Sequence, residues 1–85
     1  MKLNHPNALK LKAVADKYLA WNQESFSGDA KMLACGEKDY ADLMSIALMI
    51  ESDEFNTIAI RKSIRNLDTF IRDYIPDNIY EIYCN

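Results

Sequence analysis

The chain contains little of the material from which tight turns are made. Its 85 residues include two glycines and two prolines. A sandwich or barrel of short strands needs a turn signal about every 8–12 residues. The scarcity of glycine and proline therefore argues against an all-β fold and favours a few helices joined by short loops.

The residues that carry much catalytic and metal chemistry are also scarce. His5 is the single histidine, and the two cysteines, Cys35 and Cys84, have neither a C-x-x-C nor a metal-binding spacing. The sequence has no glycine-rich phosphate loop, no G-x-S-x-G and no H-E-x-x-H. We therefore expect no catalytic residue, no metal site, no cofactor and no enzymatic activity. A nucleophilic pair of Cys35 and His5 is the alternative, although Cys35 lies in an apolar run that predicts burial.

Long apolar runs are absent. No segment approaches the ~18–20 consecutive apolar residues that a membrane-spanning helix needs. The first residues, MKLNHPNALKLK, contain no continuous apolar stretch of the secretory type. These features predict a cytoplasmic protein without a transmembrane segment, whose thiols are reduced rather than joined in a Cys35–Cys84 disulfide.

An excess of basic charge is absent as well. Ten lysines and arginines face thirteen acidic residues, which gives a net charge of −3. Proteins that bind nucleic acid through its phosphates usually carry a basic excess. The charge therefore disfavours nucleic acid as the main partner.

Apolar residues, by contrast, are plentiful and follow helical spacing. They make up 49% of the chain, which is enough for one small core, so residues 1–85 are expected to form a single helical domain. A first amphipathic helix is predicted over about residues 6–23, with Asn4 or Asn7 as its cap. Its apolar positions are Leu11, Val14, Ala15, Tyr18 and Trp21.

The middle of the chain allows two interpretations. Asp29 is expected to cap a helix, which Gly36 either ends or continues as one kinked helix over residues 29–51. The charged residues directly after Gly36 resemble a fresh helix start, so we favour the break. Apolar side chains then cover nearly the whole circumference of Leu43–Ile50, which predicts a central helix buried on all sides, or one buried in a homodimer.

The last third predicts one longer helix and a short terminal one. An apolar stripe with steps of four and three residues indicates a helix from a cap at Asp53 or Asn56 to the residue before Pro76. The stripe consists of Ile60, Ile64, Leu67, Ile71 and Tyr74. We therefore predict an all-α fold, a small compact bundle of three longer helices plus one or two short ones.

Two groups of residues stand out as candidates for contact with a partner. Three arginines share one broad face of the predicted Arg61–Arg72 helix, where Asp68 can pair with them. This face is a solvated surface with salt bridges, a binding surface for an acidic partner, or a contact for nucleic acid. The terminal NIYEIYC segment either closes the core or forms an apolar patch, extended by the aromatic residues of the first helix. The candidate residues are Tyr18, Trp21, Arg61, Arg65, Arg72, Ile79, Tyr80 and Tyr83.

The sequence thus favours a small cytoplasmic protein that regulates or inhibits another protein by surface contact. Its size and composition suit the small accessory proteins of phages and mobile elements, which commonly act on host transcription, defence systems or lysis timing. The alternative is a dimeric nucleic-acid-binding regulator that uses the Arg61–Arg72 helix. Salt-dependent retention on DNA or RNA distinguishes this alternative.

Overall fold

The structure is a computed structural model that describes residues 2–52 and 56–84. All regular secondary structure in these residues is helical, which confirms the all-α prediction. Two helices are long and three are short, so the third longer helix of the prediction is replaced by shorter pieces. The helices are α1 (Pro6–Ser25), α2 (Ala30–Ser52), α3 (Thr57–Arg65), α4 (Thr69–Arg72) and α5 (Asp77–Tyr83).

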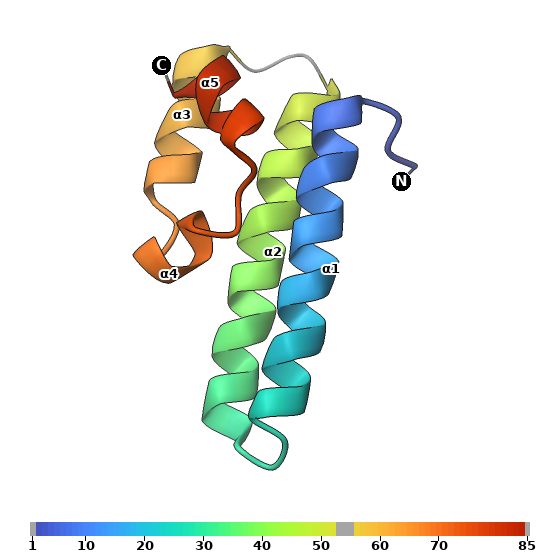
Figure 1. Cartoon of the computed structure of the whole chain (residues 1–85), viewed down its shortest axis with the longest axis vertical. Helices are drawn as coiled ribbons and strands as arrows, with labels where there is room; N and C mark the ends of the chain where they lie inside the picture. Colours follow the sequence, from blue (N-terminus) through green and yellow to red (C-terminus); the bar gives the residue numbers. More distant parts are fainter. Residues whose placement is uncertain (1, 53–55, 85) are drawn as a thin grey trace.

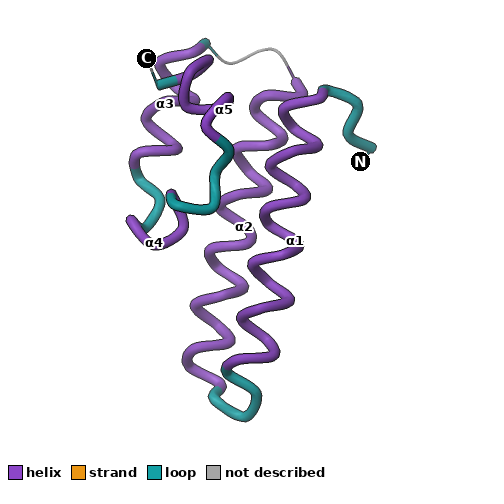
Figure 2. The backbone as a smooth tube through the Cα atoms, viewed as in Figure 1, coloured by secondary structure: helices purple, strands orange, loops and turns teal. Residues whose placement is uncertain are grey.

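The two long helices form an antiparallel hairpin, and the three short helices lie beside one part of it. In Figure 1, α3, α4 and α5 sit next to the half of α2 that contains its C-terminal end. The other end of the hairpin, with the loop shown in Figure 2, extends beyond them. The molecule therefore has an elongated outline, with principal extents of 39 × 27 × 18 Å.

The first helix starts at Pro6 and is capped by a residue that the sequence analysis did not choose. The His5 Nδ1 accepts a hydrogen bond from the Asn7 N–H at 3.1 Å, so neither Asn4 nor Asn7 is the cap. The proline fits here because the first turn of a helix leaves its N–H groups unpaired. At the other end of the hairpin, Asp29 caps α2 as predicted, since its Oδ1 accepts from the Met32 N–H at 3.2 Å.

The second helix runs without interruption through Gly36, so the predicted break there is wrong. Gly36 is buried against the side chain of Asn22 on α1, and a β-carbon at position 36 would overlap the Asn22 amide. The glycine is thus explained by close approach of the two long helices rather than by a helix end. Sequence spacing within α2 alone could not show this contact, because the partner lies on α1.

The apolar Leu43–Ile50 segment is not buried on all sides, contrary to the prediction. Leu43, Ile46 and Ile50 are buried, whereas Leu48 is exposed. Helix α1 packs along one side of this segment and α3 lies beside another (Figure 1). Helices α1 and α3 of the same chain therefore bury much of the apolar surface for which a homodimer was considered.

The predicted helix before Pro76 is divided into α3 and α4 by a short turn. The Asn66 N–H donates to the Lys62 carbonyl at 3.0 Å, and the Leu67 N–H to the Ile64 carbonyl at 3.1 Å, which ends α3. The turn keeps the apolar stripe on the core side: Ile60, Ile64, Leu67 and Ile71 are all buried. Helix α3 is capped by Asn56, whose Oδ1 accepts from the Ala59 N–H at 2.8 Å; the other predicted cap, Asp53, lies outside the described residues.

The N-terminal segment is tied to the end of α2 by one carboxylate. Glu51 Oε1 accepts from the Asn4 N–H at 2.6 Å and from the His5 N–H at 2.7 Å. Both hydrogen bonds lower the pKa of Glu51 from its usual value, and the bond from His5 has the larger effect. The contact holds the chain where Leu3 reaches the core and where His5 caps α1.

We expect Glu51→Gln to destabilise the protein at neutral pH but not at strongly acidic pH. A carboxyl whose pKa is lower in the folded state contributes stability above its unfolded pKa, and this stability is lost as the pH falls through the folded pKa. Urea midpoints of both proteins from about pH 3 to about pH 7 test this. The gap between the two proteins should open as the pH rises; a constant gap would show that the Glu51 charge contributes nothing.

Candidate interaction surface

Five aromatic side chains gather on one side of the hairpin, and we call them the aromatic cluster. The Trp21 ring centroid lies 5.5 Å from that of Phe70 and 5.7 Å from that of Phe26. The Phe70 centroid is 5.7 Å from that of Tyr74, and Tyr18 lies 6.0 to 6.2 Å from Trp21, Phe70 and Tyr74. These separations and tilts are typical of favourable ring pairs. The cluster therefore joins α1, the hairpin loop and the α4 region through side-chain contacts.

Part of the aromatic cluster faces solvent. The exposed fraction is 39% for Trp21 and 48% for Phe70, while Tyr18 is buried beneath them. Exposed tryptophan and phenylalanine are costly to leave in water, and adjacent ones are typical of binding surfaces. Of the predicted partner-binding residues, the structure thus brings Tyr18 and Trp21 together.

The aromatic cluster borders a cavity of about 430 Å³ between α1, α2 and α4, which we call the aromatic cavity. Its walls combine aromatic rings with two carboxylates, an amide and a thiol. The lining residues are Tyr18, Trp21, Asn22, Phe26, Met32, Cys35, Asp39, Asp68 and Phe70. The mixture of apolar walls with a few polar groups is common in ligand sites.

One carboxylate of the aromatic cavity is buried and held by a tyrosine. The Tyr18 hydroxyl donates to Asp39 Oδ2 at 3.0 Å. Burial raises the pKa of Asp39, and the negative charge of Asp68 raises it further. The hydrogen bond from Tyr18 lowers this pKa but does not cancel the effect of burial. Burial and the bond to Asp39 also raise the pKa of the Tyr18 hydroxyl, which keeps it protonated as a donor.

Asn22 supplies the other buried polar group of the aromatic cavity. The side chain is 2% exposed, and its Nδ2 donates to the Met32 carbonyl at 3.3 Å. Its Oδ1 is buried without a hydrogen-bond partner among the described residues. Leaving a buried acceptor unpaired costs about 1–3 kcal/mol, and this amide lies against Gly36 of α2.

The terminal segment mainly closes the core. Ile79 and Tyr83 are buried, and Tyr80 is half-buried with its hydroxyl donating to the Arg72 carbonyl at 2.7 Å. Ile82 lies on the same helix but is exposed, as are Asp77 and Glu81. The segment adds no ring to the aromatic cluster, whose members in the last third are Phe70 and Tyr74.

The three candidate arginines do not form a strip on one helix. The turn after α3 separates Arg61 and Arg65 from Arg72, which lies on α4. The Arg61 Nε–H donates to the Tyr83 carbonyl at 3.1 Å, and the Arg72 Nη2 donates to Thr69 Oγ1 at 2.8 Å. Arg65 is exposed. Two of the three side chains thus make contacts within the fold.

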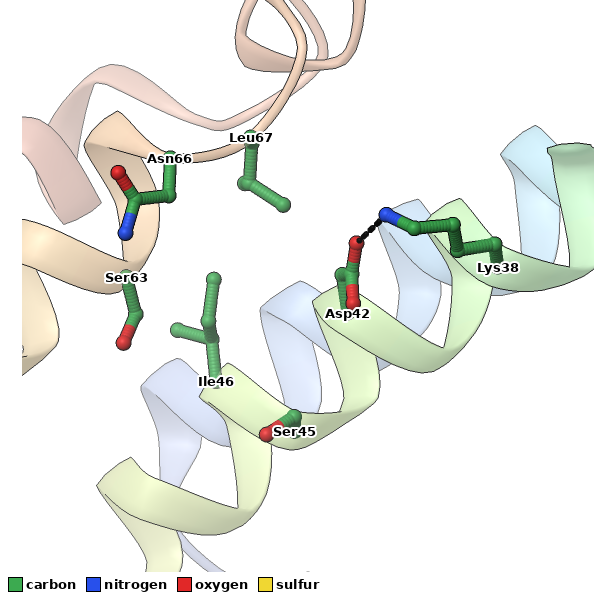
Figure 3. Close-up of a pocket in the computed structure, with 7 residues that line it drawn as sticks. All are labelled: Lys38, Asp42, Ser45, Ile46, Ser63, Asn66 and Leu67. Carbon is green, nitrogen blue, oxygen red and sulfur yellow. Dashed lines mark hydrogen bonds and ion pairs between the residues drawn. The ribbon is translucent and has the colours of Figure 1, made fainter.

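A second, more polar depression of about 300 Å³ lies between α2 and α3. Figure 3 shows Ile46 and Leu67 between a Lys38–Asp42 pair on one side and the polar side chains of Ser63 and Asn66 on the other. The lysine Nζ is 3.1 Å from the Asp42 carboxylate, and both groups are substantially exposed. Such paired, solvated charges contribute little binding energy, and the aromatic cavity is the stronger candidate site.

The reactive side chains are dispersed. Cys35 is exposed, which contradicts its predicted burial, and Cys84 is half-buried; neither thiol is in a disulfide here. His5 is engaged at the cap of α1. Within the described residues, no three histidine, cysteine or acidic side chains are grouped so that they could hold a metal ion.

Much of the aromatic cavity was not predicted from the sequence. Phe26 was not singled out, and Phe70 lies outside the predicted apolar stripe. Asp39 is one of the charged residues after Gly36 that resemble a helix start, yet it lies within α2 and is buried beside Tyr18. The sequence offered one indication of this site, a phenylalanine (Phe70) directly beside the predicted core stripe. The remaining contacts of the cavity join segments that are distant in the chain.

Comparison with protein-family models, curated proteins and solved structures finds no match to this chain. Among the described helices, none combines the length and apolar character needed to cross a membrane.

Proposed function

We propose that this chain is a small cytoplasmic regulator or inhibitor that binds another protein through the aromatic cluster. The observation that carries the proposal is the pair of exposed rings, Trp21 and Phe70, which pack on each other above the aromatic cavity. Aromatic residues at the centre of a surface, next to a pocket, dominate the energy of many protein interfaces. The role requires no catalytic residue, metal or cofactor.

The size and composition of the chain support a place among the accessory proteins of phages or mobile elements. The corresponding targets are proteins of host transcription, defence or lysis timing. The loop end of the hairpin extends beyond the three short helices (Figure 1), so a partner can approach that end from several directions.

We expect the Trp21→Ser/Phe70→Ser double variant to lose its protein partner. Tagged wild-type protein should capture one protein from a native lysate, and the purified partner should bind the double variant at least about ten-fold more weakly, because each aromatic anchor contributes on the order of 1–2 kcal/mol. Circular dichroism must show that the variant keeps its helices. Binding can then be measured by calorimetry.

The matched control replaces two exposed isoleucines outside the aromatic cluster. Ile58 on α3 is 58% exposed and Ile82 on α5 is 50% exposed. The Ile58→Ser/Ile82→Ser variant removes comparable apolar surface and should bind as the wild type does. If the control loses the partner while the Trp21/Phe70 variant retains it, the interface lies on α3 and α5 and the aromatic cluster is not the docking surface.

A further inference from the structure

Two of the polar groups that line the aromatic cavity are carboxylates, which accept hydrogen bonds and hold negative charge. Asp39 and Asp68 bring these carboxylates from two different segments. The described residues that line the cavity include no lysine, arginine or histidine. Lys38, whose charge acts on Asp39, is paired with Asp42 at 3.1 Å. The cavity therefore has negative character, and the described residues that line it supply no cationic side chain to balance it.

The aromatic walls favour the same kind of occupant. The faces of aromatic rings are negative, and a cation within about 6 Å of a ring centroid is attracted to them, most strongly by tryptophan. Trp21, Phe26 and Phe70 all line the cavity. The Trp21 ring centroid lies 5.7 Å from that of Phe26 and 5.5 Å from that of Phe70. A cationic group in this space would contact rings and carboxylates together.

The two carboxylates narrow the choice among cations, because they accept hydrogen bonds. A quaternary ammonium group carries no N–H and cannot donate to either carboxylate. A lysine ammonium has three donors but is compact and strongly hydrated, so its transfer into a partly apolar cavity is costly. A guanidinium is planar, more weakly hydrated, stacks on aromatic rings and presents five N–H donors. It matches two carboxylates and ring faces at once.

We propose that the aromatic cavity binds an arginine side chain of the protein partner. The inference deepens the proposed function and rests on it, because it assumes that the partner docks over Trp21 and Phe70. The guanidinium lies between the rings and the carboxylates of Asp39 and Asp68. The exposed rings pack around the aliphatic part of the arginine and shield it from water.

Trp21 provides a direct readout, because it is the single tryptophan of the chain and lines the cavity. The full chain is titrated with N-acetyl-arginine N-methylamide and, separately, with the citrulline analogue, which has nearly the same shape but no charge. We expect a saturable change in tryptophan fluorescence with the arginine compound, at least about five-fold tighter than with citrulline, and weaker at high salt. The lysine analogue and choline are titrated in the same way.

Two acidic residues of the α4 region provide matched variants. Asp68 lines the cavity, whereas Asp73, at the other end of the short helix, does not. Neither side chain makes a hydrogen bond that caps α4. We expect Asp68→Asn to weaken the arginine compound about three-fold or more, and Asp73→Asn to leave its affinity unchanged.

Several results would overturn the inference. These are no saturable response to the arginine compound, equal affinity for citrulline, tighter binding of the lysine analogue or choline, and equal effects of the Asp68 and Asp73 variants. The proposed function fails separately. If the partner binds through Trp21 and Phe70 but the chain does not bind the arginine compound, the docking surface stands and arginine is excluded as the occupant of the cavity.

Discussion

Replacing Gly36 with leucine is expected to destabilise the protein by about 3 kcal/mol, a large effect for one residue in the middle of a helix. Helix propensity alone predicts the opposite sign, because leucine is a better helix former than glycine by roughly 0.5–1 kcal/mol. The packing decides the outcome: the Asn22 amide occupies the position of a β-carbon at residue 36. A larger side chain must push the two long helices apart at this level.

The matched comparison uses alanine and removes the Asn22 amide. Gly36→Ala should still be destabilising, whereas the Asn22→Ala/Gly36→Ala double variant should recover most of the loss, because the overlap is gone and alanine favours the helix. Chemical denaturation of the four proteins gives the coupling energy, which we expect to be about 1–2 kcal/mol. Additive effects, or stabilisation by Gly36→Ala in the wild-type background, would show that the two residues do not touch.

The close contact also matters for the candidate site, because Asn22 lines the aromatic cavity. Fluorescence of Trp21, one residue away in the chain, should therefore shift in Gly36→Leu but not in Leu48→Ala, a control at an exposed position on the same helix. If both variants leave the emission unchanged, the overlap at position 36 is relieved without moving the cavity wall.

The fold class could be predicted from the sequence because it depends on local spacing. The steps of three and four between Ile60, Ile64, Leu67 and Ile71 placed these residues in the core correctly, although a turn divides their helix. The spacing survives because a brief turn changes the direction of the backbone without changing which side chains face inward. Helix boundaries depend on individual hydrogen bonds, such as that from the Leu67 N–H to the Ile64 carbonyl, and periodicity does not encode them.

The candidate site was harder to predict because its residues come from four separate segments. Trp21 was singled out as an aromatic residue near a helix end, yet its neighbour Phe70 lies far along the chain and was not chosen. Gly36 was interpreted as a helix end because the only local reason for glycine is its backbone freedom. Its actual reason is the approach of Asn22, which is a tertiary contact. The cavity arises from such contacts, and single-segment patterns contain no information on them.

The Tyr18→Phe substitution is expected to cost about 1–3 kcal/mol at neutral pH, although it removes a single oxygen atom. The hydroxyl donates to the buried Asp39 carboxylate, and its loss leaves a charge with no hydrogen-bond donor among the described side chains. Burial already raises the pKa of Asp39, and the Tyr18 hydrogen bond opposes this change. The variant should therefore raise the pKa of Asp39 further.

The sign of the pH dependence follows from this direction. Since the pKa of Asp39 is higher in the folded state, its contribution favours folding below the unfolded pKa and is lost as the pH rises through the folded pKa. Removing the Tyr18 hydroxyl raises the pKa of Asp39 further and so increases the stability that is lost as the pH rises. The stability deficit of Tyr18→Phe should thus be largest near neutral pH and shrink as Asp39 becomes protonated in acid.

Chemical denaturation at about pH 4 and about pH 7 tests this expectation with two controls. In an Asp39→Asn background the phenylalanine should cost much less, because no charge is left buried. Tyr40→Phe removes a hydroxyl that donates to the exposed Asp16 carboxylate at 3.3 Å, and it should change the stability by no more than about 0.5 kcal/mol. Equal costs for the two tyrosines, or a Tyr18 deficit independent of pH, would contradict a buried charge at Asp39.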